Sequence, residues 1–140
     1  MHSPAGTYAG WVGSHMRNEY LPDLLSSLPL ELQSVIKAVE KETQHGESNA
    51  KATEKLWLLS LGEIMSTGVD GVQYKYYQTI QDGDIATNRI KYLSNGNGAV
   101  AYWWLRTCLG SVNFHVVHPN GNIMNAQQQN AYAICFGFCV

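Results

Sequence analysis

The sequence has 140 residues, a charged content of 14% and a formal net charge of −2. A chain of this length forms one domain that buries about two-thirds of the surface exposed by its unfolded state. It holds no cluster of Lys or Arg, which excludes a groove that follows nucleic-acid phosphates. It also has no signal-peptide pattern at its start and no apolar run near the ~20 residues that span a bilayer, so we expect no membrane insertion.

The first part of the chain contains two helix signals. Ser14 can cap a short helix over 15–20, and Pro22 is expected to end that helix. A second helix is predicted from Leu28-Pro29, because proline is favoured in a first turn and apolar residues follow at helical spacing: Leu32, Val35, Ile36 and Val39. Residues 36–43 also alternate as in a strand, so the pattern favours a helix that gives way to a strand.

The middle of the chain begins with a weakly apolar stretch. Residues 44–53 hold almost no bulky apolar side chain, which predicts an exposed loop. Residues 56–59 form a short apolar run typical of a buried strand. The pattern from Ser60 to Glu63 fits a capping box and predicts a helix that runs to about residue 66.

A tyrosine-rich segment follows and is closed by a turn signal at Asp82-Gly83-Asp84. It contains Tyr74, Tyr76, Tyr77 and Ile80. Amphipathic aromatic side chains usually cover the edges of a core, so we interpret them as packing residues. A separate tyrosine-rich binding patch is the alternative.

The final third carries the clearest pattern. A turn is predicted at 95–98, strands at 101–106 and 112–117, a hairpin turn at 118–122 and an apolar strand at 131–140. Turns and not long crossovers join these strands, which favours an antiparallel sheet with helices on one side. The predicted class is α+β.

Four motifs in this sequence resemble an uncharacterised family of bacterial and phage domains: residues 55–63, Tyr102-Trp103-Trp104-Leu105-Arg106-Thr107, residues 114–121, and Phe136-Gly137-Phe138 near the end. Such domains are similar to the C-type lectin fold of formylglycine-generating enzymes and of the variable proteins of diversity-generating retroelements. The resemblance covers nearly the whole chain. It implies a C-type lectin-like fold, with a small twisted antiparallel sheet, two or three short flanking helices and long loops.

The resemblance also bears on domain organisation. It implies that residues 1–140 form a single C-type lectin-like domain. That fold normally opens with a strand that pairs with the C-terminal one, and little before Tyr8 could supply it. We therefore expect a domain that lacks its first strand or is cut from a longer protein, and the partner of the last strand stays open.

In the variable proteins, the diversified positions lie between the Trp-Leu-Arg strand and the last strand. The matching ligand-binding candidates here are Thr107, Leu109, Ser111, Val112, Asn113, His115, His118, Asn120, Asn122, Asn125 and Tyr132. The resemblance implies a protein or glycan ligand on a cell surface, and a place on a phage virion or a bacterial cell surface. From composition alone, the amide-rich residues 120–130 form either a solvated loop or an adaptable recognition loop.

The residues favour recognition over catalysis. Cys135 and Cys139 alternate with apolar residues and are read as buried, reduced thiols, whereas Cys108 at a strand end is expected to be more exposed. One disulfide between two cysteines is the alternative. His115 and His118 lie three apart, which places their rings on opposite strand faces and argues against a metal pair.

The predicted strand over 101–106 carries three large side chains whose surroundings can be anticipated. Trp103 and Trp104 point to opposite faces, so one lies in the core and the other is either covered or part of a surface platform. Arg106 is expected to bond loop carbonyls or a carboxylate such as Glu63, since its guanidinium donates up to five hydrogen bonds.

We expect that the protein is not an enzyme and that it binds no cofactor and no metal. A calcium site at His118-Pro119-Asn120 is not expected, because no carboxylates accompany these residues. The alternatives are a structural component of a phage virion and an enzyme of the formylglycine-generating type that uses Cys135 or Cys139. Homo-oligomerisation is left open.

Overall fold

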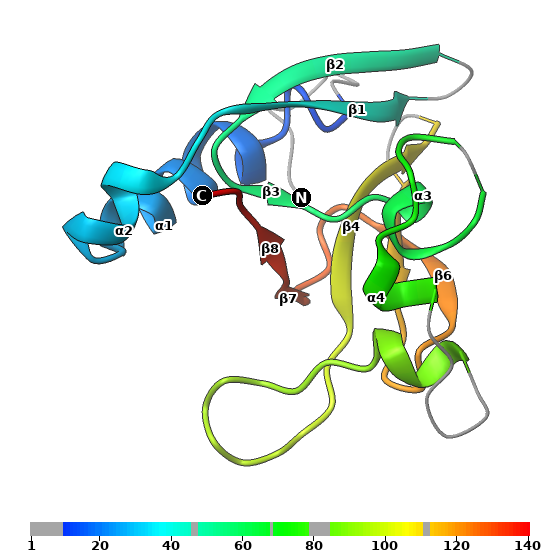
Figure 1. Cartoon of the computed structure of the whole chain (residues 1–140). Helices are drawn as coiled ribbons and strands as arrows, with labels where there is room; N and C mark the ends of the chain where they lie inside the picture. Colours follow the sequence, from blue (N-terminus) through cyan, green and yellow to red (C-terminus); the bar gives the residue numbers. More distant parts are fainter. Residues whose placement is uncertain (1–9, 46–47, 68, 79–84, 111–112) are drawn as a thin grey trace.

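The computed structural model describes residues 10–45, 48–67, 69–78, 85–110 and 113–140. Within these residues the fold is α+β, as predicted (Figure 1). The strands are β1 (Val39–His45), β2 (Ser48–Glu54), β3 (Trp57–Leu58), β4 (Trp103–Leu109), β5 (Asn113–Val117), β6 (Ile123–Gln127), β7 (Ala133–Ile134) and β8 (Phe136–Gly137). The helices are the π-helical η1 (Met16–Tyr20), α1 (Leu21–Ser27), α2 (Leu30–Val35), α3 (Leu61–Ile64), α4 (Lys75–Gln78) and the 3₁₀ helix η2 (Ile85–Arg89).

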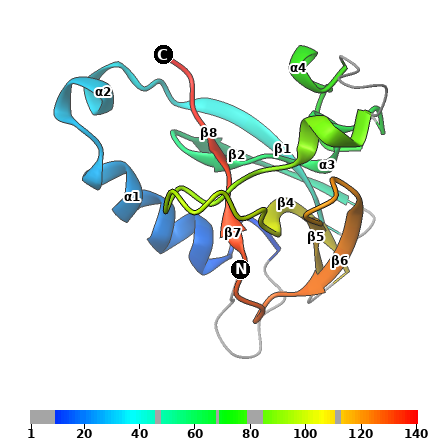
Figure 2. The same cartoon turned by 90° about the horizontal axis from the view of Figure 1, so that it is seen from below.

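The described strands form two sheets. The larger has the order β2-β1-β4-β5-β6, with β7 beside β4, and the smaller joins β3 to β8. Figure 2 shows α1 and α2 lying apart from β5 and β6, with the chain end of β8 between the two regions. The hairpin of β5 and β6 therefore lies at one side of the molecule, away from these helices.

The N-terminal helix is longer than expected. Ser14 Oγ accepts a hydrogen bond from the backbone N–H of Arg17, so the predicted cap is confirmed. Pro22 does not end the helix, because η1 continues directly into α1 and Pro22 lies in the first turn of α1. The Leu21 N–H still bonds back to Met16 O, and the wider π-helical turn η1 lies where Pro22, which has no N–H to donate, enters the helix.

The second helix and its change to a strand are confirmed, with different limits. Pro29 occupies the position just before α2 and not its first turn; α2 ends at Val35, and β1 begins at Val39. The predicted loop over 44–53 is wrong. β1 and β2 form an antiparallel hairpin in register from Val39 and Glu54 to His45 and Ser48. β2 is an edge strand with mostly exposed side chains, so its backbone pairing leaves no apolar signal in the sequence.

The central segment agrees closely with the sequence prediction. Trp57 and Leu58 form a buried strand, and Ser60 and Glu63 form a complete capping box at the start of α3. Helix α3 ends at Ile64, which is earlier than expected. Tyr77 is buried on α4 whereas Tyr76 is exposed, and Ile80 and the turn at 82–84 lie outside the described residues.

The hairpin of β5 and β6 is confirmed, whereas the last strand is not a single element. β5 and β6 pair antiparallel from Asn113 and Gln127 to Val117 and Ile123. The predicted strand over 131–140 divides into β7, which runs parallel to β4, and β8, which pairs with β3. The sheet is therefore mixed and not wholly antiparallel; β1 also meets β4 in parallel, at His45 and Cys108. Turn motifs in the sequence predict only the pairing of neighbouring segments, so they could not predict these long-range parallel pairs.

A β-bulge in β4 decides how its side chains are placed. Trp104 pairs with Val116 and Cys108 pairs with Phe114, so three residues of β4 oppose the single residue His115. A bulge lets successive side chains depart from strict alternation. All residues from Trp103 to Cys108 are buried. Trp103 and Trp104 pair in register before the bulge and face opposite sides, where Trp103 bonds to Arg89 O and Trp104 packs on Tyr132, so both lie in the core.

Candidate ligand-binding surface

A buried polar network surrounds Arg106 and Glu63. Arg106 Nη1 lies 2.6 Å from Glu63 Oε2, as the sequence predicted, and both side chains are almost fully buried. Arg106 also donates to the backbone oxygens of Leu58, Glu42 and Asp70 and to Thr43 Oγ1. These bonds occupy all five N–H groups of the guanidinium, so Arg106 links β4 to β1, β3 and the loop after α3.

Glu63 is equally saturated. Its Oε1 accepts from Lys41 Nζ at 2.9 Å and from the Tyr74 hydroxyl at 2.8 Å. Its Oε2 accepts from Arg106 and from the Ser60 backbone N–H. Burial by itself would raise the pKa of Glu63, but Arg106, Lys41 and the Ser60 N–H together hold that pKa below 4.5.

Asp70 completes the network from the loop after α3. Its Oδ1 accepts from the Gly62 N–H, and its Oδ2 accepts from Thr107 Oγ1 at 2.6 Å. Asp70, Lys41 and Tyr74 were not predicted as members of this network. A single carboxylate in a loop, a lysine in an edge hairpin and one tyrosine among several carry no signal of a shared partner.

A polar hollow of roughly 280 Å³ opens beside this network, between β1 and the loop after α3. The buried charged residues on its wall are Arg106, Glu63 and Asp70. Arg106 and Glu63 bond to each other, and the Asp70 carboxylate accepts from the Gly62 N–H and from Thr107. Lys41 Nζ also lies 4.0 Å from the centroid of the Trp57 ring. A ligand here would have to break bonds within the protein, so we assign the network a structural role.

The hairpin of β5 and β6 presents a different polar surface. Asn113 pairs with Gln127 and His115 with Asn125, and directly opposite residues in a sheet share a face. We call these four residues the amide ribbon. The side chains on the other face of the hairpin, Phe114, Val116 and Ala126, are buried in the core. The ribbon's own face becomes apolar at the next pair, Val117 and Ile123, where Val117 is fully buried, so the ribbon is the polar part of this face, away from the turn.

Most of the ribbon lacks partners within the protein. In the described parts of the chain, the side chains of Asn113, Asn122 and Asn125 make no hydrogen bond, and Asn122 and Asn125 are exposed. His115 is partly buried, and its Nδ1 is buried without a partner among the described residues. Burial lowers the pKa of His115 against the opposing effects of Asp70 and of a backbone hydrogen bond at Met124. Gln127 was not predicted, although its register opposite Asn113 places it here.

The structure does not bring all the predicted ligand residues together. Thr107 is fully buried in the network and cannot reach a ligand, which corrects that assignment; the β4 bulge turns it inward. Leu109 is exposed at the end of β4 beside Asn113. Asn120 lies in the turn after β5, where its Oδ1 accepts from the Asn122 N–H, so it shapes the turn. Ser111 and Val112 lie outside the described residues.

Tyr132 and His118 belong to a ring stack on the face of the sheet opposite the ribbon. Tyr132 lies between the buried Trp104 and Tyr102, with centroid distances of 5.1 and 5.0 Å. Tyr102 then contacts His118 at 4.9 Å. The four rings lead from the core to the surface, so Tyr132 and His118 support the frame and are not part of the ribbon.

The cysteines are free, as predicted, but their burial differs from the prediction. Cys108 is fully buried and not exposed at a strand end, and burial raises the pKa of its thiol to about 11. Cys135 is half-buried, and burial raises its pKa as well. Cys139 is exposed and not buried, since the chain leaves the short strand β8 before it.

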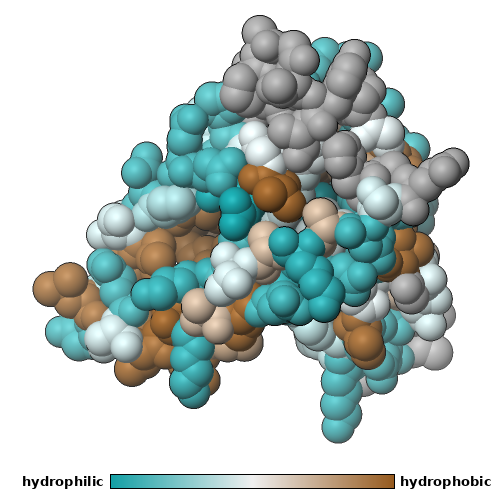
Figure 3. Space-filling view, turned by 90° about the horizontal axis from the view of Figure 1, so that it is seen from above, coloured by the Kyte–Doolittle hydropathy of each residue, from teal (hydrophilic) through white to brown (hydrophobic). Residues whose placement is uncertain are grey.

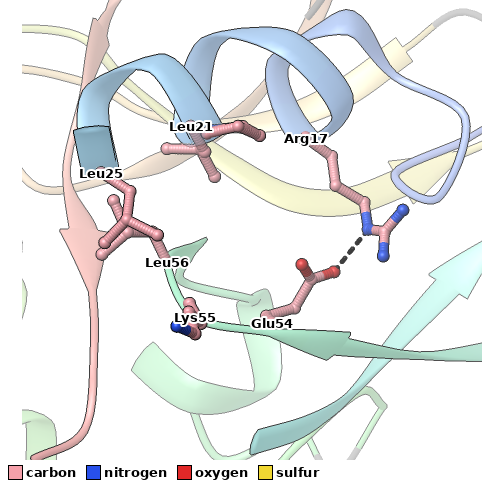
Figure 4. Close-up of a pocket in the computed structure, with 7 residues that line it drawn as sticks. Arg17, Leu21, Leu25, Glu54, Lys55 and Leu56 are labelled. Atoms are coloured by element: carbon pink, nitrogen blue, oxygen red, sulfur yellow. Dashed lines mark hydrogen bonds and ion pairs between the residues drawn. The ribbon is translucent and has the colours of Figure 1, made fainter. Parts of the chain in front are cut away.

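A second side of the molecule carries an apolar region over α1 and α2. Figure 3 shows brown side chains gathered on the side of these helices, beside the hydrophilic β1–β2 hairpin. A small hollow of about 100 Å³ lies under α1, with Leu21, Leu25 and Leu56 on its wall (Figure 4). The ion pair of Arg17 and Glu54 closes one end of it at 2.6 Å. Its size suits one small side chain.

The described residues hold no group of three or more His, Cys, Asp or Glu side chains placed to bind a metal. They also contain no helix with the length and apolar character to cross a bilayer.

These features define a small α+β domain with a saturated buried network and a polar hairpin surface. The chain belongs to the family described as "Domain of unknown function (DUF6273)", whose sequence profile matches residues 3–140. The expected membership of an uncharacterised domain family is confirmed to that extent. No curated protein and no solved structure matches the chain.

Proposed function

We propose that this domain is a non-enzymatic recognition module that binds a protein or glycan on a cell surface through the amide ribbon. The proposed architecture is C-type lectin-like, with β4 as the rigid strand and the β5–β6 hairpin as the display element. Asn113, His115, Asn125 and Gln127 make the central contacts in this proposal, and Leu109 and Asn122 border them.

The observation that carries this proposal is a contrast between two polar surfaces. Arg106 and Glu63 have no hydrogen-bonding capacity left for a ligand, because protein groups fill every donor and acceptor position. Asn113, Asn122 and Asn125 are the reverse case, since none of their side chains bonds to another described residue. Amide side chains on a rigid support are typical of adaptable recognition surfaces.

The chemistry of the cysteines supports the non-enzymatic part of the proposal. A nucleophilic thiol needs a lowered pKa and an electropositive, accessible position. Burial instead raises the pKa of Cys108 and Cys135. These are the thiols of a packed interior and not of a reactive site.

We further propose that the region from Thr107 to Ile134 is diversified, as in the variable proteins of diversity-generating retroelements. This part of the proposal rests on the resemblance and on the placement of the ribbon after the Trp-Trp-Leu-Arg strand. The surrounding DNA tests it. A near-copy of codons 105–140 beside a reverse-transcriptase gene, differing mainly at adenines, would support diversification, and the absence of such a copy would count against it.

Binding of the labelled domain to fixed bacterial cells of several species tests recognition itself. The test variant combines Asn113→Ala, Asn125→Ala and Gln127→Ala, and the control is Thr53→Ala, an exposed residue on the edge strand β2. We expect the control to bind as the original protein does and the triple variant to lose at least about tenfold in affinity, since truncation of a few central contacts has this effect.

Treatment of the cells before binding separates the two ligand classes. Loss of binding after periodate oxidation indicates a glycan, and loss after protease digestion indicates a protein. Unchanged binding by a folded triple variant, or no binding to cells of any species, would contradict the proposal.

A further inference from the structure

Strand β6 is an open edge of the larger sheet. It lies at the end of the strand order β2-β1-β4-β5-β6, and Figure 2 shows it at the outer side of the sheet, beyond β5. Among the described residues β6 pairs with β5 alone, in register and without a bulge. One side of its backbone is therefore without a strand neighbour in this part of the chain.

The register shows which backbone groups face the open side. His118 N–H donates to Asn122 O, and hydrogen-bonded pairs alternate with non-bonded pairs along an antiparallel ladder. Residues 124 and 126 are thus the positions of β6 that bond to β5. The N–H and C=O groups that point to the open side belong to the other three positions, Ile123, Asn125 and Gln127.

These outward groups are almost wholly unpaired. Among the described residues they make one hydrogen bond, in which Asn130 N–H donates to Gln127 O at 3.1 Å. Backbone N–H and C=O groups are strong donors and acceptors, and a row of them on an edge strand is a template for another strand. The open side of β6 is such a row.

The sequence of β6 lacks the usual protection of an edge strand. Natural edge strands are protected by charged side chains, by proline or by a bulge. The opposite edge, β2, follows this rule, because Lys51 at its centre forms an exposed ion pair with Glu40. No Asp, Glu, Lys or Arg occurs after Arg106 in the sequence, and β6 contains no proline. It is therefore suited to accept a strand.

The two faces of β6 differ in chemistry. Asn125 and Gln127 are exposed on the face of the amide ribbon, whereas Met124 is 39% exposed on the opposite face. Side chains of a strand added to β6 would alternate between these faces and lie beside them. Polar side chains on one face could bond the ribbon amides, and apolar side chains on the other could cover Met124.

We propose that the ligand is a protein whose extended segment, with alternating polar and apolar side chains, adds to the open edge of β6 as a further strand. An extended peptide backbone carries donors and acceptors at the spacing of the row on β6, and a glycan does not. The backbone bonds supply affinity, and the side chains that meet the ribbon supply specificity. The inference rests on the proposed recognition function and selects one of its two ligand classes.

Asn125 allows a test that separates the backbone from the side chain. Asn125→Ala removes the amide side chain and keeps the outward N–H, whereas Asn125→Pro removes both. An edge strand tolerates proline where the N–H faces away from the sheet, so we expect both variants to fold.

The probes are peptides of about ten residues, long enough for one strand, selected on the original domain from a random display library. We expect Asn125→Pro to bind them at least about tenfold more weakly than Asn125→Ala does, because a carbonyl of the peptide loses its donor. Equal affinities of the two variants, or a library that yields no binding peptide, would overturn the proposal.

Amide hydrogen exchange of the original domain requires no substitution. The N–H groups of Ile123, Asn125 and Gln127 should exchange rapidly in the free domain and become protected when a selected peptide binds. Those of Met124 and Ala126 should be protected in both states, because they bond to β5. Unchanged exchange at the three outward groups would overturn the proposal. A dimer of the domain that Asn125→Pro dissociates would do so too, since a second copy would then occupy the edge.

Binding to cells separates this inference from the function on which it rests. If the triple ribbon variant loses binding while Asn125→Pro and Asn125→Ala bind equally, the ribbon recognises the ligand and strand addition is wrong. Binding that survives protease digestion of the cells and is lost after periodate has the same meaning. If the folded triple variant binds as the original domain does, the proposed function itself fails, and the peptide affinities decide on strand addition.

Discussion

Arg106 Nη1 and Glu63 Oε2 lie 2.6 Å apart at the centre of the domain, with 1% and 4% of their side chains exposed. Contacts from three further parts of the chain reach this pair: Lys41 from β1, Leu58 O and the Ser60 N–H from the segment between β3 and α3, and Asp70 O from the loop after α3. A buried pair of this kind is costly to break from one side, because the remaining charge loses its partner in a medium that solvates it poorly.

We therefore predict that Arg106→Gln lowers the free energy of unfolding by about 3–5 kcal/mol, measured by urea denaturation. The exposed pair of Lys51 and Glu40, at 2.8 Å, provides the control. Lys51→Gln should leave the unfolding midpoint unchanged, since water solvates both charges whether or not they pair. Equal effects of the two substitutions would mean that the network does not hold the segments together.

The pH dependence of stability should report on Glu63. The pKa of Glu63 in the folded protein lies below its ordinary value of 4.5 in the unfolded chain. At pH values between the folded pKa and 4.5, the unfolded state therefore binds more protons than the folded state. The stabilisation is thus complete above pH 4.5 and is lost as the pH falls through the folded pKa. Glu63→Gln should be less stable at neutral pH and should lose less stability on acidification. An unchanged slope in the Gln variant would assign the acid sensitivity to other carboxyl groups.

His115 should add a second loss of stability on acidification, in a higher pH range than that of Glu63. Burial lowers its pKa below 6.5, so the folded state resists protonation that the unfolded chain accepts. Stability should therefore decline as the pH falls below 6.5 and should level off once the folded imidazole is also protonated. His115→Gln should remove this decline. Imidazole titration by NMR checks the cause, and a His115 pKa at or above 6.5 would be inconsistent with the buried ring.

The turn between β5 and β6 depends on Gly121. Its φ is +85°, and a Cβ there would lie 1.9 Å from the backbone oxygen of Ala86. Gly121→Ala should therefore destabilise the domain by clearly more than the roughly 1–2 kcal/mol that left-handed strain alone costs. Gly96 is the matched control, with φ of +79° and open space around its Cβ position. Thermal melts of both variants compare strain plus collision with strain alone.

Local signals in the sequence predicted a substantial part of this structure. The capping box of Ser60 and Glu63, the hairpin of β5 and β6 and the partnership of Arg106 with Glu63 were all evident, because each depends on turn chemistry or on the demands of one buried side chain. The exposed β1–β2 hairpin was missed, since edge strands with polar side chains do not alternate in hydropathy.

The remaining differences have a common physical origin. The inward turn of Thr107 and the burial of Cys108 both follow from the β4 bulge, which is set by tertiary packing. The split of the last strand into β7 and β8 depends on two partners far away in the sequence. Because of these effects the predicted ligand region divides between two faces, and only its middle part forms the ribbon.

The central claim is that the frame folds without help from the ribbon, so that ribbon residues are free to serve a ligand. Randomisation of Asn113, His115, Asn125 and Gln127 together, with protease resistance of displayed clones as the readout, tests this claim most directly. A matched library would randomise Ser60, Glu63, Asp70 and Thr107. We predict that most ribbon clones resist the protease and that few network clones do. Loss of resistance in most ribbon clones would contradict the account, because the ribbon would then be part of what holds the domain together.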